Sequence, residues 1–357
     1  MAVDRRTMLL MAGGGIVVAC SGGAVVNRHD GFSNDMAEAN GTTATPPVAR
    51  EGFASIWASF KANYVQPDGR VVDSGNNGIS HTEGQGYALV MAAHAGDREA
   101  FDRILAWTEK TLARPGDPLF SWRYDPRAST PIGDSNNATD GDMLIAWGLM
   151  LGVDRWREQR FAERAAAIRN ALRDTMVRQV AGETYLLPGG TGFVQGDRLT
   201  LNPSYYVWPA LQRFRAADGD ARWAPVLRGG EALLKRARFG AHALPTDWVD
   251  VAADGSMSPA ADRPPRFGFD AVRVPLYLAM ADRSALGDAI ARFWRGYGDR
   301  PIPAWIDVRT GETAPYPLSE GAMGAVRLLL GRPLPPPTPQ ADYYAAVLQA
   351  LAHLRPA

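Results

Sequence analysis

Residues 82–87 read Thr82-Glu83-Gly84-Gln85-Gly86-Tyr87 and open directly into an apolar run at 88–95. This pattern places a carboxylate and two glycines at the start of a helix that is apolar on most of its faces. A helix of that kind is buried by neighbours all round, so it belongs to the inside of a helical protein. A carboxylate just ahead of such a helix is well placed to point into a cleft.

Two further stretches repeat this design. Ala138-Thr139-Asp140-Gly141-Asp142 precedes the apolar run 143–151, and Phe267-Gly268-Phe269-Asp270-Ala271-Val272-Arg273 precedes 274–280. In all three stretches, therefore, an acidic residue and a glycine lie at the start of an apolar helix. We expect Glu83, Asp140 and Asp270 to converge at one end of a helical bundle. Carboxylates gathered in one cleft are the groups that glycoside hydrolysis uses.

Apolar and amphipathic helices alternate along the chain from a first amphipathic helix at 53–64. Inner helices contact neighbours on all sides while outer ones keep a polar face, so the alternation predicts an all-α barrel of helical hairpins with no convincing strand pattern. A solenoid would alternate too, but the chain has no fixed repeat. The expected apolar helices are 83–95, 139–152, 203–215, 270–280 and 318–330, and the amphipathic ones 97–112, 156–180, 222–237, 285–297 and 341–354.

Two long connections, 114–138 and 248–269, interrupt the helices and carry Trp122, Tyr124 and Trp248. Long loops rich in aromatic and acidic residues usually build a site. Each aromatic alone is more often part of a core than a ligand platform. Ten tryptophans, several of them in polar surroundings, nevertheless suit stacking on sugar faces.

The composition excludes several classes of partner. The 357 residues contain 38 Lys+Arg and 38 Asp+Glu, so no net charge favours nucleic acid or an anionic membrane. The five histidines show no paired ligand spacing, which makes a metal site unexpected. Gly84-Gln85-Gly86 lacks a third glycine and follows no strand, so it is no dinucleotide fingerprint. No cofactor is implied, and acid–base chemistry by carboxylates remains.

The N-terminus reads as an export signal over residues 1–20. Arg5-Arg6 precedes an apolar, glycine-rich segment at 8–19 that is too short to span a membrane. The paired arginines resemble a twin-arginine signal, with an ordinary signal as the alternative. Cys20, the only cysteine, ends a lipobox-like sequence. We expect a periplasmic or secreted protein, with lipid anchoring through Cys20 as an option, a tether at 21–48 and one catalytic domain at 49–357.

Each acidic motif also has a purely structural explanation. Glu83 could be a first-turn residue on a helix capped by Ser80 or Thr82. Asp270 and Arg273 could form a simple i,i+3 ion pair. The two glycines next to Glu83 weaken a helix by roughly 1 kcal/mol each relative to alanine. Close approach of a ligand would explain why they are tolerated.

The motifs occur in the order seen in glycoside hydrolase family 8, which the chain resembles from about residue 52 to 353. Besides the three acidic stretches, Asn202-Pro203-Ser204-Tyr205 and Asp247-Trp248-Val249 carry the resemblance. Within the family the chain is most similar to the endoglucanase that accompanies bacterial cellulose synthase. The resemblance implies an (α/α)6 barrel with an open groove and hydrolysis of β-1,4-glucan with inversion.

The resemblance also implies roles for individual residues. Glu83 would be the general acid and Asp270 the base that activates water. Asp140 would hold the sugar at the cleavage subsite and help to position that water. The expected contacts to substrate are Trp122, Tyr205, Trp248, Arg273, Gln85 and Asp142, with Arg273 also supporting Asp270. The implied partners are a β-glucan and a cellulose synthase assembly, and the chain is expected to be a monomer.

Inversion needs room for water, so the carboxyls of Glu83 and Asp270 should lie roughly 6.5–9.5 Å apart. Four alternatives stay open on sequence alone. The same fold could act on xylan, on mixed-linkage glucan or on chitosan, whose amino groups would favour extra acids such as Asp134, Asp142 and Asp250. A glycan-binding envelope protein without catalysis is a fourth. The predicted helices fall slightly short of the family's twelve, which suggests that one has been missed or merged.

Overall fold

The computed structural model describes residues 47–354, with side chains from residue 52 onward. The predicted export signal, Cys20 and nearly all of the predicted tether lie outside this range. None of the helices within it has the length and apolarity that a membrane span requires. The described chain contains eleven α-helices: α1 (Pro47–Tyr64), α2 (Thr82–Ala95), α3 (Arg98–Leu112), α4 (Thr139–Trp156), α5 (Gln159–Met176), α6 (Trp208–Asp218), α7 (Asp220–Arg236), α8 (Arg273–Met280), α9 (Asp288–Arg295), α10 (Glu320–Leu329) and α11 (Tyr343–His353).

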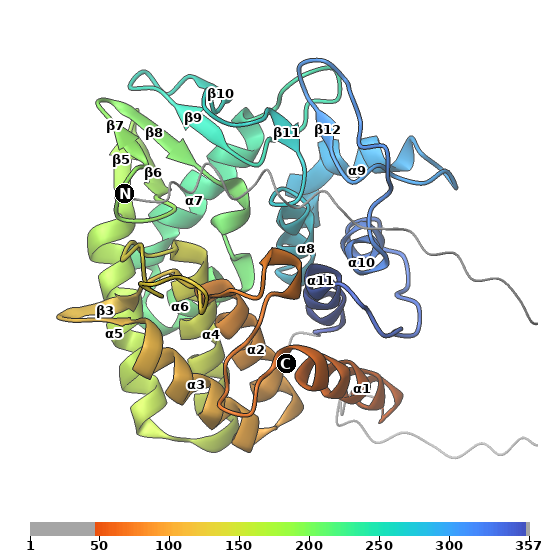
Figure 1. Ribbon diagram of the computed structural model, residues 1–357. Coiled ribbons are helices and arrows are strands. Elements are labelled where there is room, and N and C mark those ends of the chain that lie inside the picture. The colour runs from red at the N-terminus through yellow and green to blue at the C-terminus, as the bar shows by residue number, and fades with distance from the viewer. Residues whose placement is uncertain (1–46, 355–357) are drawn as a thin grey trace, which may run out of the picture.

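The helices form two concentric rings (Figure 1). The inner ring runs α2, α4, α6, α8, α10 and α11, and it closes because α11 packs against α2. The outer helices α1, α3, α5, α7 and α9 each cover an inner neighbour. The inner helix α2 is buried along nearly its whole length, whereas α3 buries only one face. This is the predicted (α/α)6 barrel, with apolar helices inside and amphipathic ones outside.

One outer position holds no helix. Between α10 and α11 the chain passes through residues 331–342, whose prolines are Pro333, Pro335, Pro336, Pro337 and Pro339. Proline lacks the backbone N–H of the helix ladder and clashes with the preceding turn, so this segment cannot be helical. The shortfall from twelve helices within residues 47–354 is therefore real, and no helix was missed there.

Short strands accompany the helices, although the sequence showed no convincing strand pattern. Residues 177–180, expected to end the helix at 156–180, form the first strand of a hairpin over 177–186, whose turn residues Ala181 and Gly182 both have positive φ. Such two-residue turns match the twist of paired strands. β7 to β10 form one antiparallel sheet at the top of Figure 1. The strands are β1 (Ser80–His81), β2 (Ala113–Arg114), β3 (Asp117–Phe120), β4 (Arg123–Tyr124), β5 (Val177–Val180), β6 (Glu183–Leu186), β7 (Val194–Gln195), β8 (Arg198–Leu201), β9 (Val249–Val251), β10 (Met257–Pro259), β11 (Arg266–Phe267) and β12 (Ile306–Asp307).

The glycines of the two leading motifs serve helix packing. A Cβ at Gly86 of α2 would lie 2.5 Å from Leu144 Cβ on α4, and a Cβ at Gly141 of α4 would lie 2.0 Å from Thr82 Oγ1 on α2. Neither distance is possible between real atoms, so α2 and α4 approach this closely only because both residues lack side chains. The expected explanation by a ligand concerned Gly84 and Gly86, and it is corrected for both: Gly86 allows this helix contact, and a Cβ at Gly84 would lie 2.6 Å from the Tyr343 hydroxyl.

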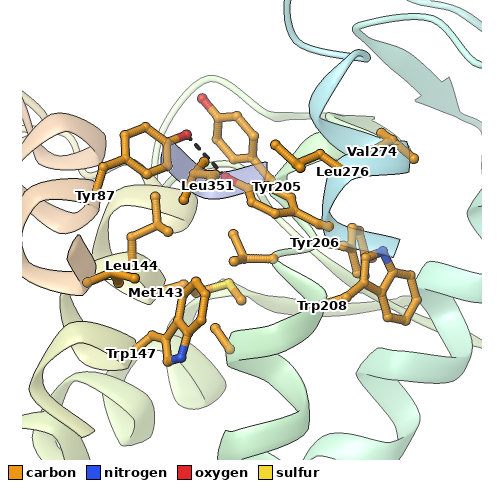
Figure 2. Packing of buried hydrophobic residues seen from close by; sticks show 14 of the residues in the cluster. Tyr87, Met143, Leu144, Trp147, Tyr205, Tyr206, Trp208, Val274, Leu276 and Leu351 are labelled. Carbon is orange, nitrogen blue, oxygen red and sulfur yellow. Dashed lines mark hydrogen bonds between the residues drawn. The ribbon is translucent and has the colours of Figure 1, made fainter. Parts of the chain in front are cut away.

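The barrel interior is filled by side chains from several helices. Figure 2 shows Tyr87 of α2, Leu144 of α4 and Leu351 of α11 packed around one space, with Trp208 of α6 nearby. All four belong to one continuous core of buried residues. The interior is therefore packed solid, and a substrate site has to lie at one end of the barrel.

We predict opposite effects for alanine at two helical glycines. Gly86→Ala should destabilise the protein by about 1–3 kcal/mol, because the new methyl overpacks the α2–α4 contact. Gly52→Ala on α1, where nothing lies within 4 Å of the new Cβ, should be neutral or stabilising by up to about 1 kcal/mol. Urea unfolding of both variants measures the difference, and equal destabilisation would contradict the close contact.

Candidate active site

The start of α8 brings the site together through one buried guanidinium. The side chain of Arg273 is only 6% exposed. Its Nη1 donates to Asp140 Oδ2 at 3.2 Å and to Tyr87 OH at 3.1 Å. Its Nη2 donates to Asp270 Oδ1 at 2.7 Å and to Ser204 Oγ at 2.9 Å. Arg273 thus ties together α2, α4, the residues before α6 and the turn before α8.

The two aspartates on Arg273 differ in exposure. Asp140 is completely buried in the first turn of α4 and accepts the Gly141 N–H at 3.0 Å. Asp270 lies in the turn before α8, since that helix begins three residues later than predicted. Its second oxygen accepts from Asn202 Nδ2 at 3.0 Å, and its side chain stays 19% exposed. Asp270 is therefore both fixed in orientation and open to water, as a base requires.

Glu83 lies in the first turn of α2, next to Gly141 of α4. A Cβ at Gly141 would lie 2.9 Å from the backbone nitrogen of Glu83, so the starts of the two helices touch. Glu83 Oε2 accepts from Thr82 Oγ1 at 3.2 Å and lies 3.4 Å from His81 Nδ1. His81 caps the helix by accepting the Gly84 N–H, which corrects the expected cap at Ser80 or Thr82. The side chain of Glu83 is 15% exposed.

Gln85 is misassigned as a substrate contact. Its side chain is completely buried, and its Oε1 accepts the Val71 N–H at 2.7 Å. Its Nε2 donates to Thr108 Oγ1 on α3 at 2.8 Å. Gln85 points outward from the barrel, where both ends of its amide fasten the 69–71 turn to α3.

Asp142 is likewise structural. It is completely buried, and its two oxygens accept from the Phe120 N–H at 3.0 Å and from Asn137 Nδ2 at 2.9 Å. Burial raises the pKa of Asp142 to about 7. A side chain with no exposed surface and both oxygens bonded cannot touch a sugar, so only Asp140 of this motif belongs to the site.

The three predicted aromatic contacts lie in the walls around these carboxylates. Trp122, Tyr205 and Trp248 are 9%, 5% and 5% exposed. Trp122 Nε1 donates to Asp134 Oδ2 at 2.7 Å. The Trp248 ring stacks on Phe193, with centroids 5.8 Å apart, and the Arg263 guanidinium lies 4.2 Å from its centroid. Sugar contact by these rings stays a prediction, and stacking on the face under Arg263 would require that side chain to move.

Sequence reasoning missed Asp247 as a member of the site. Its Oδ1 accepts the N–H groups of Gly268 at 3.1 Å and Ala271 at 2.7 Å, which bracket Asp270. Burial and the neighbouring Asp270 raise the pKa of Asp247 to about 7. The motif Asp247-Trp248-Val249 was recognisable, but only the fold brings it beside residue 270. Phe269, exposed by 36% next to Asp270, was missed as well.

Comparisons with known sequences and structures agree on one family for this chain. The sequence model of Glycosyl hydrolases family 8 matches residues 28–355. The chain belongs to this family. An endoglucanase of Cellulomonas uda is 42% identical over 82% of each chain, and a probable endoglucanase of Novacetimonas hansenii is 38% identical over 95% of this chain and 97% of that one. The crystal structure of the family 8 endoglucanase Cel10 from Klebsiella pneumoniae, 42% identical, superposes with a TM-score of 0.81 over 84% of this chain and 97% of the other.

As a member of family 8, the protein is a glycoside hydrolase that inverts the anomeric carbon. Inverting hydrolysis needs an acid on one side of the scissile bond and a base with water on the other. The described site contains the carboxyl of Glu83 on α2, which lies against His81 and Thr82. It also contains the carboxylates of Asp140 and Asp270, which both accept hydrogen bonds from Arg273. The separation of Glu83 and Asp270 stays a prediction.

We predict that Asp247→Asn changes the pH profile of the family 8 activity. The amide oxygen of asparagine can still accept both backbone N–H groups, so the turn around Asp270 is kept. Because the pKa of Asp247 is about 7, wild type carries a second negative charge beside Asp270 only above that pH. The kcat/KM values of the two proteins should agree within roughly twofold at acid pH and diverge above neutrality.

Asp254→Asn is the matched control, because Asp254 caps an exposed turn in the same long connection. Its profile should superpose on wild type throughout. If Asp247→Asn also superposed at every pH, titration of Asp247 would have no influence on the base.

Proposed function

We propose that the protein is an endo-β-1,4-glucanase that cleaves cellulose or a related β-glucan. Glu83 is the general acid, Asp270 the general base, and Asp140 holds the sugar at the cleavage subsite. The observation that carries this proposal is the bridge that Arg273 makes between Asp140 and Asp270. It places two oriented carboxylates at the barrel end where Glu83 begins α2. The three relatives named above are endoglucanases or a probable endoglucanase, and their names support the substrate class.

The proposed reaction is a single displacement. Glu83 gives its proton to the glycosidic oxygen while the bond from that oxygen to the anomeric carbon breaks. Asp270 accepts a proton from water, whose oxygen bonds to the anomeric carbon from the opposite face. Arg273 keeps one oxygen of Asp270 occupied, and Asn202 holds the other, so the base is pre-oriented before substrate arrives.

Among the alternative polymers, chitosan loses most of its sequence support. Asp142 is fully buried, and Asp250 is 5% exposed with its oxygens bonded to Thr200 Oγ1 and the Ala261 N–H, so neither acid is placed to meet the amino groups of a polymer. Asp134 is half-buried and accepts from Trp122 Nε1, so it alone of the three keeps chitosan as an alternative. Xylan and mixed-linkage glucan remain alternatives within the same fold and mechanism.

The proposal extends to location and partners. Arg5-Arg6, the apolar segment 8–19 and Cys20 support export to the periplasm or medium, with lipid anchoring as the alternative. We further propose that the protein is monomeric and trims glucan during cellulose biosynthesis, alongside a cellulose synthase assembly. The resemblance of the sequence motifs to the endoglucanase that accompanies bacterial cellulose synthase is what supports this role.

The proposal predicts hydrolysis of carboxymethylcellulose by the purified domain and a split between two variants. Glu83→Gln should lose roughly 10²–10⁴-fold in kcat on this polymer. It should lose far less on an aryl β-cellobioside whose leaving group needs no proton. Asp270→Asn should fail on both substrates, because water still has to be activated. Release of reducing ends and of the aryl group measures the two reactions.

Glu99→Gln is the matched control, since Glu99 is an exposed residue of α3 whose side chain is 85% exposed. Activity confined to xylan or mixed-linkage glucan would overturn the substrate and leave the mechanism. Glucan binding without turnover by the wild type would favour the non-catalytic envelope protein.

A further inference from the structure

A histidine joins the proposed acid to another carboxylate that the reaction leaves without a role. His81 Nε2 lies 3.3 Å from Asp73 Oδ2, and His81 Nδ1 lies 3.4 Å from Glu83 Oε2. The three side chains are each only 14–15% exposed. Asp73, His81 and Glu83 therefore form a carboxylate–imidazole–carboxylate array at the start of α2, which we call the acid array.

A tyrosine from the other end of the chain covers the acid array. The ring of Tyr343, on α11, meets the His81 ring edge to face with centroids 6.0 Å apart. A Cβ at Gly84 would lie 2.6 Å from the Tyr343 hydroxyl, so the phenol packs on the glycine that follows Glu83. This hydroxyl is buried without a hydrogen-bond partner among residues 47–354. Burial raises its pKa, so Tyr343 stays neutral and covers one side of the imidazole, while the three side chains of the array keep some exposure to solvent.

Other charges around the acid array are acidic or already paired. Arg123 lies opposite His81 in the β1–β4 pair, but its guanidinium donates to Asp125 Oδ2 at 3.0 Å. Asp342, the cap of α11, comes close to the Asp73 loop, since a Cβ at Gly75 would lie 3.5 Å from an oxygen of each. The imidazole thus sits in a field of carboxylates, which favours a bound proton.

The hydrogen bonds define where that proton sits. Asp73 accepts from His81 Nε2, which leaves the lone pair of the neutral ring on Nδ1. The Gly84 N–H donates to this Nδ1 at 3.0 Å, so the backbone favours the state in which Nδ1 carries no proton. Glu83 Oε2 faces the same lone pair at 3.4 Å, so one proton can be shared between His81 Nδ1 and Glu83 Oε2. When Glu83 is ionised, hydrogen bonds to Asp73 and Glu83 outweigh the opposing effect of burial and raise the pKa of His81 to about 10.

We propose that Asp73 and His81 keep Glu83 loaded with the proton that it donates in each turnover. The inference rests on the proposed role of Glu83 as the acid. As the glycosidic bond breaks, the O–H bond of Glu83 breaks and its proton moves to the leaving oxygen. The new carboxylate faces Nδ1, which takes a proton from solvent and passes it to Oε2. The proton that Asp270 takes from water returns to solvent, so the cycle balances. His81 is a positioning residue, because it acts through Glu83.

Asparagine at either position separates this role from simple helix capping. His81→Asn keeps a side-chain oxygen for the Gly84 N–H, since asparagine is among the best N-caps, but removes the titrating ring. Asp73→Asn removes the charge behind the ring. In both variants the alkaline limb of kcat/KM on carboxymethylcellulose should move to lower pH by about one unit or more, because the proton is held less tightly. The double variant should move no further than the larger single shift, because Asp73 acts through His81.

His242→Asn is the matched control, because His242 is exposed and packs only on Phe293 among the rings of the described chain. Its profile should match wild type. Superposable profiles for wild type, His81→Asn and Asp73→Asn would overturn the proposal and leave His81 as a cap. Additive shifts in the double variant would also contradict a single array.

A titration by nitrogen NMR gives a readout that needs no activity. The His81 resonances, assigned by their loss in His81→Asn, should titrate well above the usual value near 6.5 in wild type and closer to it in Glu83→Gln. Titration near 6.5 in both proteins would overturn the proposal even if a variant failed to fold. Full activity of Glu83→Gln on carboxymethylcellulose would instead overturn the acid assignment, so the two failures are distinguishable.

Discussion

The contact between α2 and α4 is the constraint on which the site depends. Because Gly86 and Gly141 lack side chains, the backbones of the two inner helices approach within a distance that any other residue would forbid. That approach sets the first turn of α2, with Glu83, directly against the first turn of α4, with Asp140. Side chains on either glycine would push the helices apart and separate the carboxylates. The geometry of the chemistry is thus fixed by packing several residues away from it.

After the contact between α2 and α4, the buried guanidinium of Arg273 is the second feature that positions the carboxylates. A guanidinium with almost no exposed surface is costly to bury unless its donors are satisfied. Its Nη1 and Nη2 donate to Asp140, Tyr87, Ser204 and Asp270, while its Nε has no hydrogen-bond partner among the described residues. Two of these partners are carboxylates, so the positive charge is compensated where it stands. The planar fork of arginine serves all four partners at once, which the three donors of a lysine ammonium could not do. Arg273 therefore holds Asp140 and Asp270 in a fixed orientation even when no substrate is bound.

The helices and the converging motifs were predictable because both leave periodic or local signals. Apolar runs follow the acidic motifs, and eleven helices appear near their expected positions. The hairpin at 177–186 was missed, because a strand of four residues is too short to show a clear alternation of apolar and polar residues. Gln85 and Asp142 were misassigned for a different reason. Sequence places them within a motif, but only the fold shows that their side chains bond to groups remote from Arg273.

Residues recruited across long sequence distances were also beyond prediction. Asp247 lies 23 residues before Asp270, and Tyr343 lies about 260 residues after Glu83, so neither association has a local signal. His81 was different, because it adjoins the motif and was dismissed for lack of a metal-ligand partner. Its partners proved to be carboxylates. A histidine next to a candidate acid is better judged by the acids that surround it than by the spacing of histidines.

The most direct measurement of the central claim is a crystal structure of Glu83→Gln with a cello-oligosaccharide spanning the cleft. The account predicts that the substituted side chain at position 83 lies within hydrogen-bond distance of one glycosidic oxygen. It also predicts a water between Asp270 and the anomeric carbon of that bond, with roughly 6.5–9.5 Å between the two side chains. A sugar bound with Asp270 and residue 83 on the same side of the bond, or remote from Arg273, would contradict it.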